Sequence, residues 1–213
     1  MEQFNILFTS AGRRVALIQH FKKVYSQLGI NGTITTTDIS RSAPAMHIAD
    51  FHEVVPKVQD PSYIDVLKEI CIRRRINLII PLIDTELKLL ALHQKEFHDM
   101  GVMVLVSSVE TNNICYDKRN TYQFFKRIGV DTPKIIDPED ILTDRNPTYP
   151  YFMKPANGSS SIGATKINNV RELSFFKDYI PNAIVQEYIE GKEYTVDVFV
   201  DFENNVRCVV PRL

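Results

Sequence analysis

One lysine and the loop of small residues that follows it are the most chemically suggestive feature of the sequence. Three apolar residues, 151–153, lead into Lys154, and a loop rich in glycine and serine extends from Ala156 to Gly163. Glycine tolerates backbone conformations that other residues resist. A concave row of backbone N–H groups beside a lysine suits a polyphosphate, whose charge is spread over many oxygens. A flexible hairpin between two strands would have the same composition, so this segment alone leaves both interpretations open.

A second group of polar residues, after position 186, suits the remainder of a nucleotide. Extended backbone from Glu187 to Ile189 would offer one carbonyl and one N–H group to the edge of a purine, and Glu193 would accept hydrogen bonds from ribose hydroxyls. Strand alternation places Glu193, Thr195 and Asp197 on one face. Burying three polar side chains there is costly unless they meet a ligand or a water-filled cleft. Simple exposure of that face to solvent is the alternative.

In the first half of the chain, candidate binding residues follow two apolar strands. Arg13 and Arg14 come after the first strand, and paired guanidinium groups at a helix start suit a carboxylate or a phosphate. A solvated first helical turn is the alternative. After a later strand, Asp84 is expected to cap the next helix. Glu86 is expected to face the crevice at the carboxyl ends of these strands, where ligands gather in such sheets. Only Gly12 stands where a GxGxxG motif would lie, which disfavours a nicotinamide dinucleotide.

Lys118 is a further candidate because of its place in the predicted helical stretch. It stands in the first turn, where a positive charge is unfavourable for the helix dipole. Binding of an anionic ligand would explain a lysine at this position. A surface lysine without a ligand is the alternative.

Composition and charge exclude several classes of protein. A chain of 213 residues suffices for one large domain or two small ones, and 44% hydrophobic with 24% charged residues is ordinary for a globular protein. A net charge of −1 provides no field that would favour nucleic acid or a membrane surface. No apolar run approaches the length of a membrane span, and the N-terminus lacks the pattern of a signal peptide. We therefore expect a cytoplasmic protein with neither a nucleic-acid nor a membrane partner.

The three cysteines are widely spaced and form no CxxC pair, so they indicate neither a zinc site nor a disulfide framework. Cys71 and Cys115 lie among apolar residues and are expected to be buried thiols. A reducing compartment suits this cysteine usage.

Two different kinds of structure must position these residues. The first 109 residues alternate strand and helix signals, which predicts a Rossmann-like α/β domain with a parallel sheet covered on both faces. The expected strands are 4–9, 33–38, 53–56, 77–82 and 102–106, and the expected helices are 13–28, 60–74 and 84–98.

The remaining residues change in character. A helical stretch, 110–128, and a proline-broken linker make up a segment from 110 to 150. An α+β unit with hairpins is predicted for residues 151–213. Its expected strands are 151–154, 164–167, 183–186, 194–200 and 206–210, around one helix at 170–179, and a tight turn is expected at 201–205.

Taken in order, these segments resemble the ATP-grasp superfamily, in particular its carbamoyl-phosphate-synthetase-like carboxylate–amine ligases. The resemblance covers the whole chain and includes GRRV, PLIDTEL, the DK helix start, FMKP, the glycine–serine loop and QEYI followed by GKEYTVDV. It implies a Rossmann-like pre-ATP-grasp domain (1–109), a helical linker (110–150) and a partial ATP-grasp nucleotide-binding subdomain (151–213).

The resemblance also assigns roles to individual residues. Lys118 and Lys154 look like the two nucleotide lysines, which reach the α- and β-phosphates from opposite sides. Glu187, Tyr188 and Ile189 look like the adenine-reading hinge, and Glu193 like the ribose acid. The flexible loop over the β- and γ-phosphates would comprise Asn157, Gly158, Ser159, Ser160, Ser161 and Gly163.

The family implies a reaction with Mg-ATP, a carboxylate and an amine or ammonia. Its magnesium ligands lie on strands beyond the hinge, so we expect them beyond residue 213, with no metal ligand in this chain. We then expect the parent enzyme to be a ligase that acts on small-molecule substrates, with a homodimer as one oligomeric state open to it. The present chain, as a fragment of that enzyme, is expected to be inactive. Arg13, Arg14, Asp84 and Glu86 are its candidate substrate residues. The alternative is a non-catalytic nucleotide-binding or scaffolding module.

Overall fold

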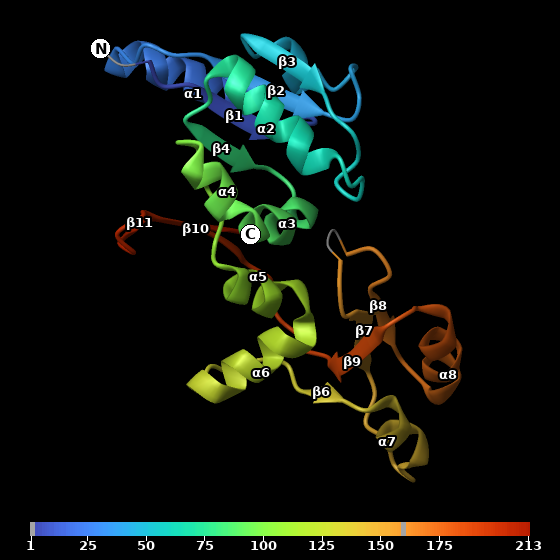
Figure 1. Cartoon of the computed structure of the whole chain (residues 1–213). Helices are drawn as coiled ribbons and strands as arrows, with labels where there is room; N and C mark the ends of the chain where they lie inside the picture. Colours follow the sequence, from blue (N-terminus) through green and yellow to red (C-terminus); the bar gives the residue numbers. More distant parts are fainter. Residues whose placement is uncertain (1–2, 159–160) are drawn as a thin grey trace. The chain divides into compact units, whose positions relative to one another are not determined.

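The computed structural model describes residues 3–158 and 161–213. The chain separates into two compact units, Met1–Thr121 and Tyr122–Leu213, drawn in blue to green and in yellow to red (Figure 1). The division lies inside helix α6 (Lys118–Ile128). The domain bounds expected from the sequence stay a prediction.

The first unit is built on a five-stranded parallel sheet with the order β3-β2-β1-β4-β5. Its strands are β1 (Ile6–Thr9), β2 (Ile34–Asp38), β3 (Phe51–Val54), β4 (Leu78–Pro81) and β5 (Met103–Val104). The chain runs outward from β1 to β3 and then returns to the other side of β1. The carboxyl ends of β1 and β4 therefore meet at the switch point where ligands bind in such sheets. The predicted α/β class is confirmed.

Helices cover both faces of this sheet, as the two core clusters on either side of β1 show. Leu7 belongs to a core cluster with residues of α2, α3 and α4, whereas Ile6 and Phe8 belong to a second cluster with residues of α1. The helical segments of this unit are α1 (Val15–Leu28), η1 (Pro44–His47), α2 (Tyr63–Arg74), α3 (Asp84–Leu92), α4 (Gln94–Asp99) and α5 (Val109–Tyr116).

Two long predicted helices are each broken in the structure. The segment expected at 84–98 divides into α3 and α4 at His93, whose φ and ψ are −101° and 6°. The segment expected at 110–128 divides into α5 and α6 at Asp117, which is extended. The Asp117 carboxylate accepts a hydrogen bond from the Arg119 N–H at 2.9 Å. This local bond starts a new helix and competes with continuation of the old one.

The second unit contains a four-stranded antiparallel sheet with the order β6-β9-β7-β8. Its strands are β6 (Ile135–Ile136), β7 (Tyr151–Pro155), β8 (Thr165–Ile167) and β9 (Ala183–Glu187), and its further helices are α7 (Pro138–Thr143) and α8 (Val170–Tyr179). Met153, Ile167 and Val185 pack with residues of α7 and α8 in one core cluster. The helices therefore cover one face of the sheet and leave the other to line a pocket.

A separate hairpin ends the described chain. It consists of β10 (Thr195–Val200) and β11 (Val206–Arg212), and every residue of both strands is exposed. The predicted tight turn between them is confirmed, because the Asp201 carboxylate accepts hydrogen bonds from the N–H groups of Glu203 and Asn205 at 2.9 and 2.8 Å. Across the described residues, no helix has both the length and the apolar character that a membrane span requires.

Helix α2 offers a test of how the first unit is held together. Leu67 is fully buried, whereas Ile72 on the same helix is 70% exposed. Leu67→Ala should lower the free energy of unfolding by about 2–5 kcal/mol, because it removes buried contacts and leaves a cavity. Ile72→Ala is the matched control and should change it by less than about 0.5 kcal/mol. Urea unfolding followed by circular dichroism measures both, and equal losses would contradict the packing of α2.

Candidate functional site

A pocket of about 510 Å³ opens in the second unit beside the end of β9. Its lining includes Lys154 on β7 and four residues that the sequence nominated as hinge and ribose acid, namely Glu187, Tyr188, Ile189 and Glu193. Residues that are more than thirty positions apart in the sequence therefore meet at one surface. The pocket lies wholly within one compact unit.

Strand register explains why Lys154 faces the pocket. Met153 is buried in the core under α7 and α8, so its neighbours Phe152 and Lys154 point to the opposite face. Phe152 pairs with Gln186 on β9, and both line the pocket. The Lys154 ammonium lies 5.7 Å from the centre of the Phe152 ring. The pocket thus combines an aromatic surface with a cation.

The start of the predicted hinge is anchored by the segment before β6. The Glu187 N–H donates to the Lys134 carbonyl at 3.0 Å, and the Lys134 N–H donates back to the Glu187 carboxylate at 2.9 Å. The Gln186 side chain donates to the Pro133 carbonyl at 3.3 Å. The N–H and the carboxylate of Glu187 are therefore engaged within the protein. By contrast, the Glu193 carboxylate accepts no hydrogen bond from residues 3–158 or 161–213.

The loop between β7 and β8 has the backbone that its composition predicts. Gly158 and Gly163 have φ values of 110° and 74°, in the region that favours glycine. A side chain at Gly163 would also approach Pro155 to 3.1 Å. Asn157 accepts a hydrogen bond from the Asn182 side chain at 2.8 Å. Ser161 has a positive φ of 56°.

Several nominated residues are absent from the lining of this pocket, namely Lys118 and the described loop residues Asn157, Gly158, Ser161 and Gly163. The nominated Ser159 and Ser160 lie outside the described residues. Lys118 is the first residue of α6 and belongs to the first unit. Its place in a shared site with Lys154 stays a prediction.

In the first unit, Glu86 lies in the interior rather than at a crevice. It has no exposed surface, and its carboxylate accepts hydrogen bonds from three hydroxyl groups. Tyr63 donates at 2.8 Å and Thr9 at 2.5 Å, and Ser10 is the third donor. Burial, together with the charge of Glu86, raises the pKa of Tyr63 well above its ordinary value. The expectation that Glu86 faces a crevice is wrong, because residues from three other positions in the fold enclose it.

The loop after β1 is shaped by contacts with its neighbours. The Gly12 N–H donates to the Asp38 carboxylate at 2.9 Å, which gives Asp38 a structural role in the turn. Arg14 donates to the Ser10 carbonyl at 3.3 Å. Arg13 and Arg14 are both exposed. Their guanidinium groups therefore lie at the surface near the carboxyl end of β1.

Asp84 does not cap α3 as expected. The N-cap position is Ile83, and Asp84 is the first helical residue, with an exposed side chain. Its charge still suits the positive end of the helix dipole.

Among the described residues, no group of three or more His, Cys, Asp or Glu side chains is arranged to hold a metal ion.

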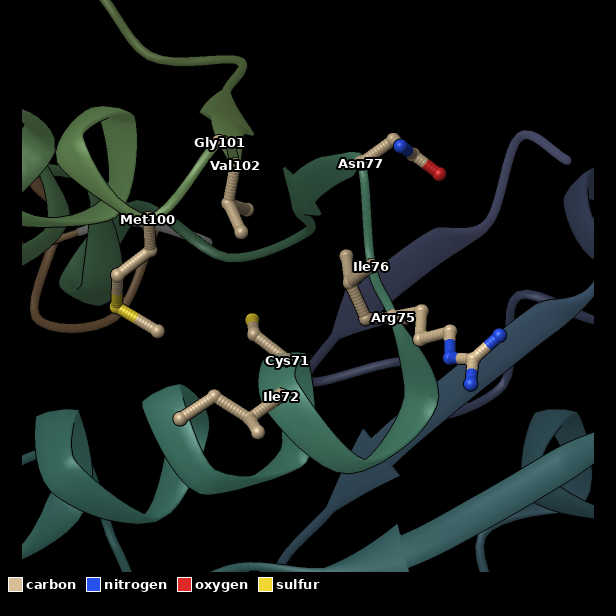
Figure 2. Close-up of a pocket in the computed structure, with 8 residues that line it drawn as sticks. All are labelled: Cys71, Ile72, Arg75, Ile76, Asn77, Met100, Gly101 and Val102. Atoms are coloured by element: carbon tan, nitrogen blue, oxygen red, sulfur yellow. The ribbon is translucent and has the colours of Figure 1, made fainter. Parts of the chain in front are cut away.

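A second pocket, of about 490 Å³, lies in the first unit at the amino ends of β4 and β5 (Figure 2). Its lining combines apolar residues, among them Cys71 on α2 and Met100 and Val102 before β5, with the polar residues Arg75 and Asn77. Burial raises the pKa of the Cys71 thiol to about 12. Cys115, expected to be buried, is exposed. Helix α5 buries Asn112 instead, whose side chain donates to the carbonyls of Ser107 and Ser108.

These environments predict different thiol reactivities. Cys115 and Cys208 are exposed and should be alkylated by iodoacetamide at pH 8 in the native protein. Cys71 should react only after denaturation, because it is buried and few of its thiols are ionised at that pH. Peptide mass spectrometry before and after denaturation measures this. Native labelling of Cys71 at the rate of Cys115 would contradict the packing of α2 against the sheet.

Two family models match the chain in succession. One, described as the PylC-like N-terminal domain, matches residues 6–105, and the other, described as an ATP-grasp domain, matches residues 115–212.

Several curated relatives are ligases. The 3-methyl-D-ornithine–L-lysine ligase of Methanosarcina mazei is 26% identical over 187 residues, which is 88% of this chain and 45% of that protein. The D-alanine–D-alanine ligase of Thermotoga petrophila is 33% identical over 103 residues, covering 46% of this chain and 34% of that protein. The chain spans at most about half the length of the curated relatives it matches.

Solved structures share the fold. The L-amino acid ligase from Bacillus licheniformis superposes with a TM-score of 0.70 at 16% identity, over 95% of this chain and 48% of that one. The biotin carboxylase domain of Hydrogenobacter thermophilus 2-oxoglutarate carboxylase, solved with MgADP, gives 0.69 at 17% identity, over 97% and 49%. At these identities the likeness concerns the fold alone.

Proposed function

Because the chain belongs to the ATP-grasp superfamily, we propose that the pocket beside Lys154 binds the adenine nucleotide of an ATP-dependent ligase. The observation that carries this proposal is the meeting of Lys154 with residues 187–189 and Glu193 in one pocket. The whole protein would join a carboxylate to an amine or ammonia. Its finer placement in the carbamoyl-phosphate-synthetase-like branch remains a prediction.

The groups in the pocket match the parts of a nucleotide. The Lys154 ammonium would pair with phosphate oxygens, and the unengaged Glu193 carboxylate would accept hydrogen bonds from ribose hydroxyls. The backbone at Tyr188 and Ile189 would read the adenine edge. Glu187 would contribute only its carbonyl, because its N–H and carboxylate are bonded to Lys134.

The loop and Lys118 complete the proposed site. Asn157, Gly158, Ser161 and Gly163, with Ser159 and Ser160, would offer N–H and hydroxyl groups to the β- and γ-phosphates. Lys118 would be the second nucleotide lysine, as the family resemblance implies.

When bound, Mg-ATP would supply the phosphoryl group that converts a carboxylate into an acyl phosphate, from which an amine displaces phosphate. The residues of this chain would hold and orient the nucleotide, and the loop would exclude water from the acyl phosphate. We assign no magnesium ligand among the described residues.

The first unit would bind the carboxylate substrate. Arg13 and Arg14 offer exposed guanidinium groups beside the switch point of the sheet, where they would pair with a carboxylate. Asp84, exposed at the start of α3, would attract an amino group. Glu86 would act indirectly by holding Ser10, whose carbonyl accepts from Arg14. Amino acids, which the names of the ligase relatives contain, are the proposed substrate class. The protein would work in the cytoplasm, where its three free cysteines stay reduced.

Calorimetry with ADP and with ATP tests the nucleotide site. Lys154→Ala should weaken nucleotide binding about tenfold or more, because a charged hydrogen bond to phosphate is lost. Lys126→Ala, which removes a lysine of α6 from outside the pocket, is the control and should bind as the wild type does. Equal affinity in the wild type and Lys154→Ala, or binding of NADH instead, would refute the site.

Turnover tests the ligase reaction. A full-length protein should convert ATP to ADP only when a suitable amino acid pair from a panel is present. Nucleotide binding without turnover against any pair would favour the non-catalytic module.

A further inference from the structure

Lys166 makes a contact that bridges the sheet of the second unit. Its ammonium lies 4.2 Å from the centre of the Tyr188 ring, within the range of a cation–π interaction. Lys166 belongs to β8 at one edge of the sheet, and Tyr188 directly follows β9. Because β7 lies between these two strands, the contact crosses over the middle strand.

The contact lies on the pocket side of the sheet. Lys166 pairs in register with Phe152, which pairs in turn with Gln186, and the last two line the pocket. Tyr188 also lines the pocket, whereas Lys166 does not. Lys166 therefore supports a residue of the pocket wall from outside the pocket.

The contact also joins two parts of the proposed site. The glycine-rich loop ends where β8 begins, so Lys166 stands just downstream of the groups proposed to cover the phosphates. Tyr188 is the first residue after the anchored Glu187, in the segment proposed to read adenine. One lysine thus links the strand that follows the loop with the hinge.

We propose that Lys166 is a positioning residue that holds the Tyr188 ring in the pocket wall and so sets the shape of the adenine subsite. This role rests on the proposed nucleotide-binding function of the pocket. The charge of Lys166 acts on the ring rather than on phosphate. Lys154, whose side chain lines the pocket, is the cation for the phosphates.

Calorimetry with two probes, ADP and inorganic tripolyphosphate, tests the role on the full chain. Lys166→Met keeps the length of the side chain but removes its charge, and should weaken ADP binding about two- to fivefold. Lys166→Arg should stay within about twofold of the wild type, since arginine also stacks on aromatic rings. Tripolyphosphate, which lacks adenine, should bind Lys166→Met as tightly as it binds the wild type.

Variants of the ring complete the cycle. Tyr188→Phe keeps the aromatic face and should bind ADP nearly as the wild type does, whereas Tyr188→Leu should weaken ADP binding as Lys166→Met does. The double variant Lys166→Met/Tyr188→Leu should be no weaker than the weaker single one, because both changes remove the same contact. Lys126→Met is the matched control, since it removes a lysine that lies 5.5 Å from the Tyr122 ring, outside the pocket.

A measurement without nucleotide isolates the positioning itself. The protein is labelled with ¹³C-tyrosine and observed by NMR, and the ring signals of Tyr188 are assigned from their absence in Tyr188→Leu. These signals should shift in Lys166→Met and not in Lys126→Met. Unchanged signals in Lys166→Met would overturn the role.

The remaining outcomes are distinguishable. Equal weakening of ADP and tripolyphosphate in Lys166→Met would make Lys166 a direct phosphate ligand and overturn its positioning role. ADP binding that Lys166→Met leaves unchanged would refute this role alone. A wild-type chain that binds neither probe would refute the nucleotide site, and the role of Lys166 with it.

Discussion

The alternation of side chains along β7 is the constraint on which the candidate site depends. Met153 is buried with residues of α7 and α8, and this commits Lys154 and Phe152 to the other face. A shift of register by one residue would bury the lysine and expose the methionine, and both changes are costly. The hydrophobic core of the second unit therefore determines where its cation points. Stability and binding are coupled through a single strand.

The same logic of period and burial made much of the fold predictable. Helix α8 lies at the predicted residues 170–179, and its start is stabilised by the Asn169 side chain, which accepts from two N–H groups of the first turn. The parallel sheet follows from continuous apolar strands separated by helices. Each of these features depends on residues that are close together in the sequence.

What could not be predicted depends on contacts between distant residues or on local competition. Glu86 is enclosed by Thr9, Ser10 and Tyr63, which no spacing rule brings together. The helix breaks at Asp117, whose carboxylate accepts a hydrogen bond from the N–H of Arg119. The spacing of apolar residues, from which the helix was predicted, contains no information about this bond. Cys115 is exposed although Asn112, one turn earlier on α5, is buried, so an apolar sequence context alone did not indicate burial. Helix α7 lies inside the predicted proline-broken linker, because Pro138 is its first residue and proline is compatible with that position of a helix.

The two hydrogen bonds between Glu187 and Lys134 also have a mechanical consequence. They pin the end of β9 to the segment before β6, so the backbone up to Glu187 moves with the sheet. Any rotation of the following segment must then take place about bonds at Tyr188 or later, where the φ and ψ changes of a hinge are absorbed. The first bonds free to rotate therefore lie one residue beyond Glu187, which itself lines the pocket. Lys154 and Phe152 lie in the sheet on the fixed side of these two hydrogen bonds, whereas Glu193 lies in the segment beyond them.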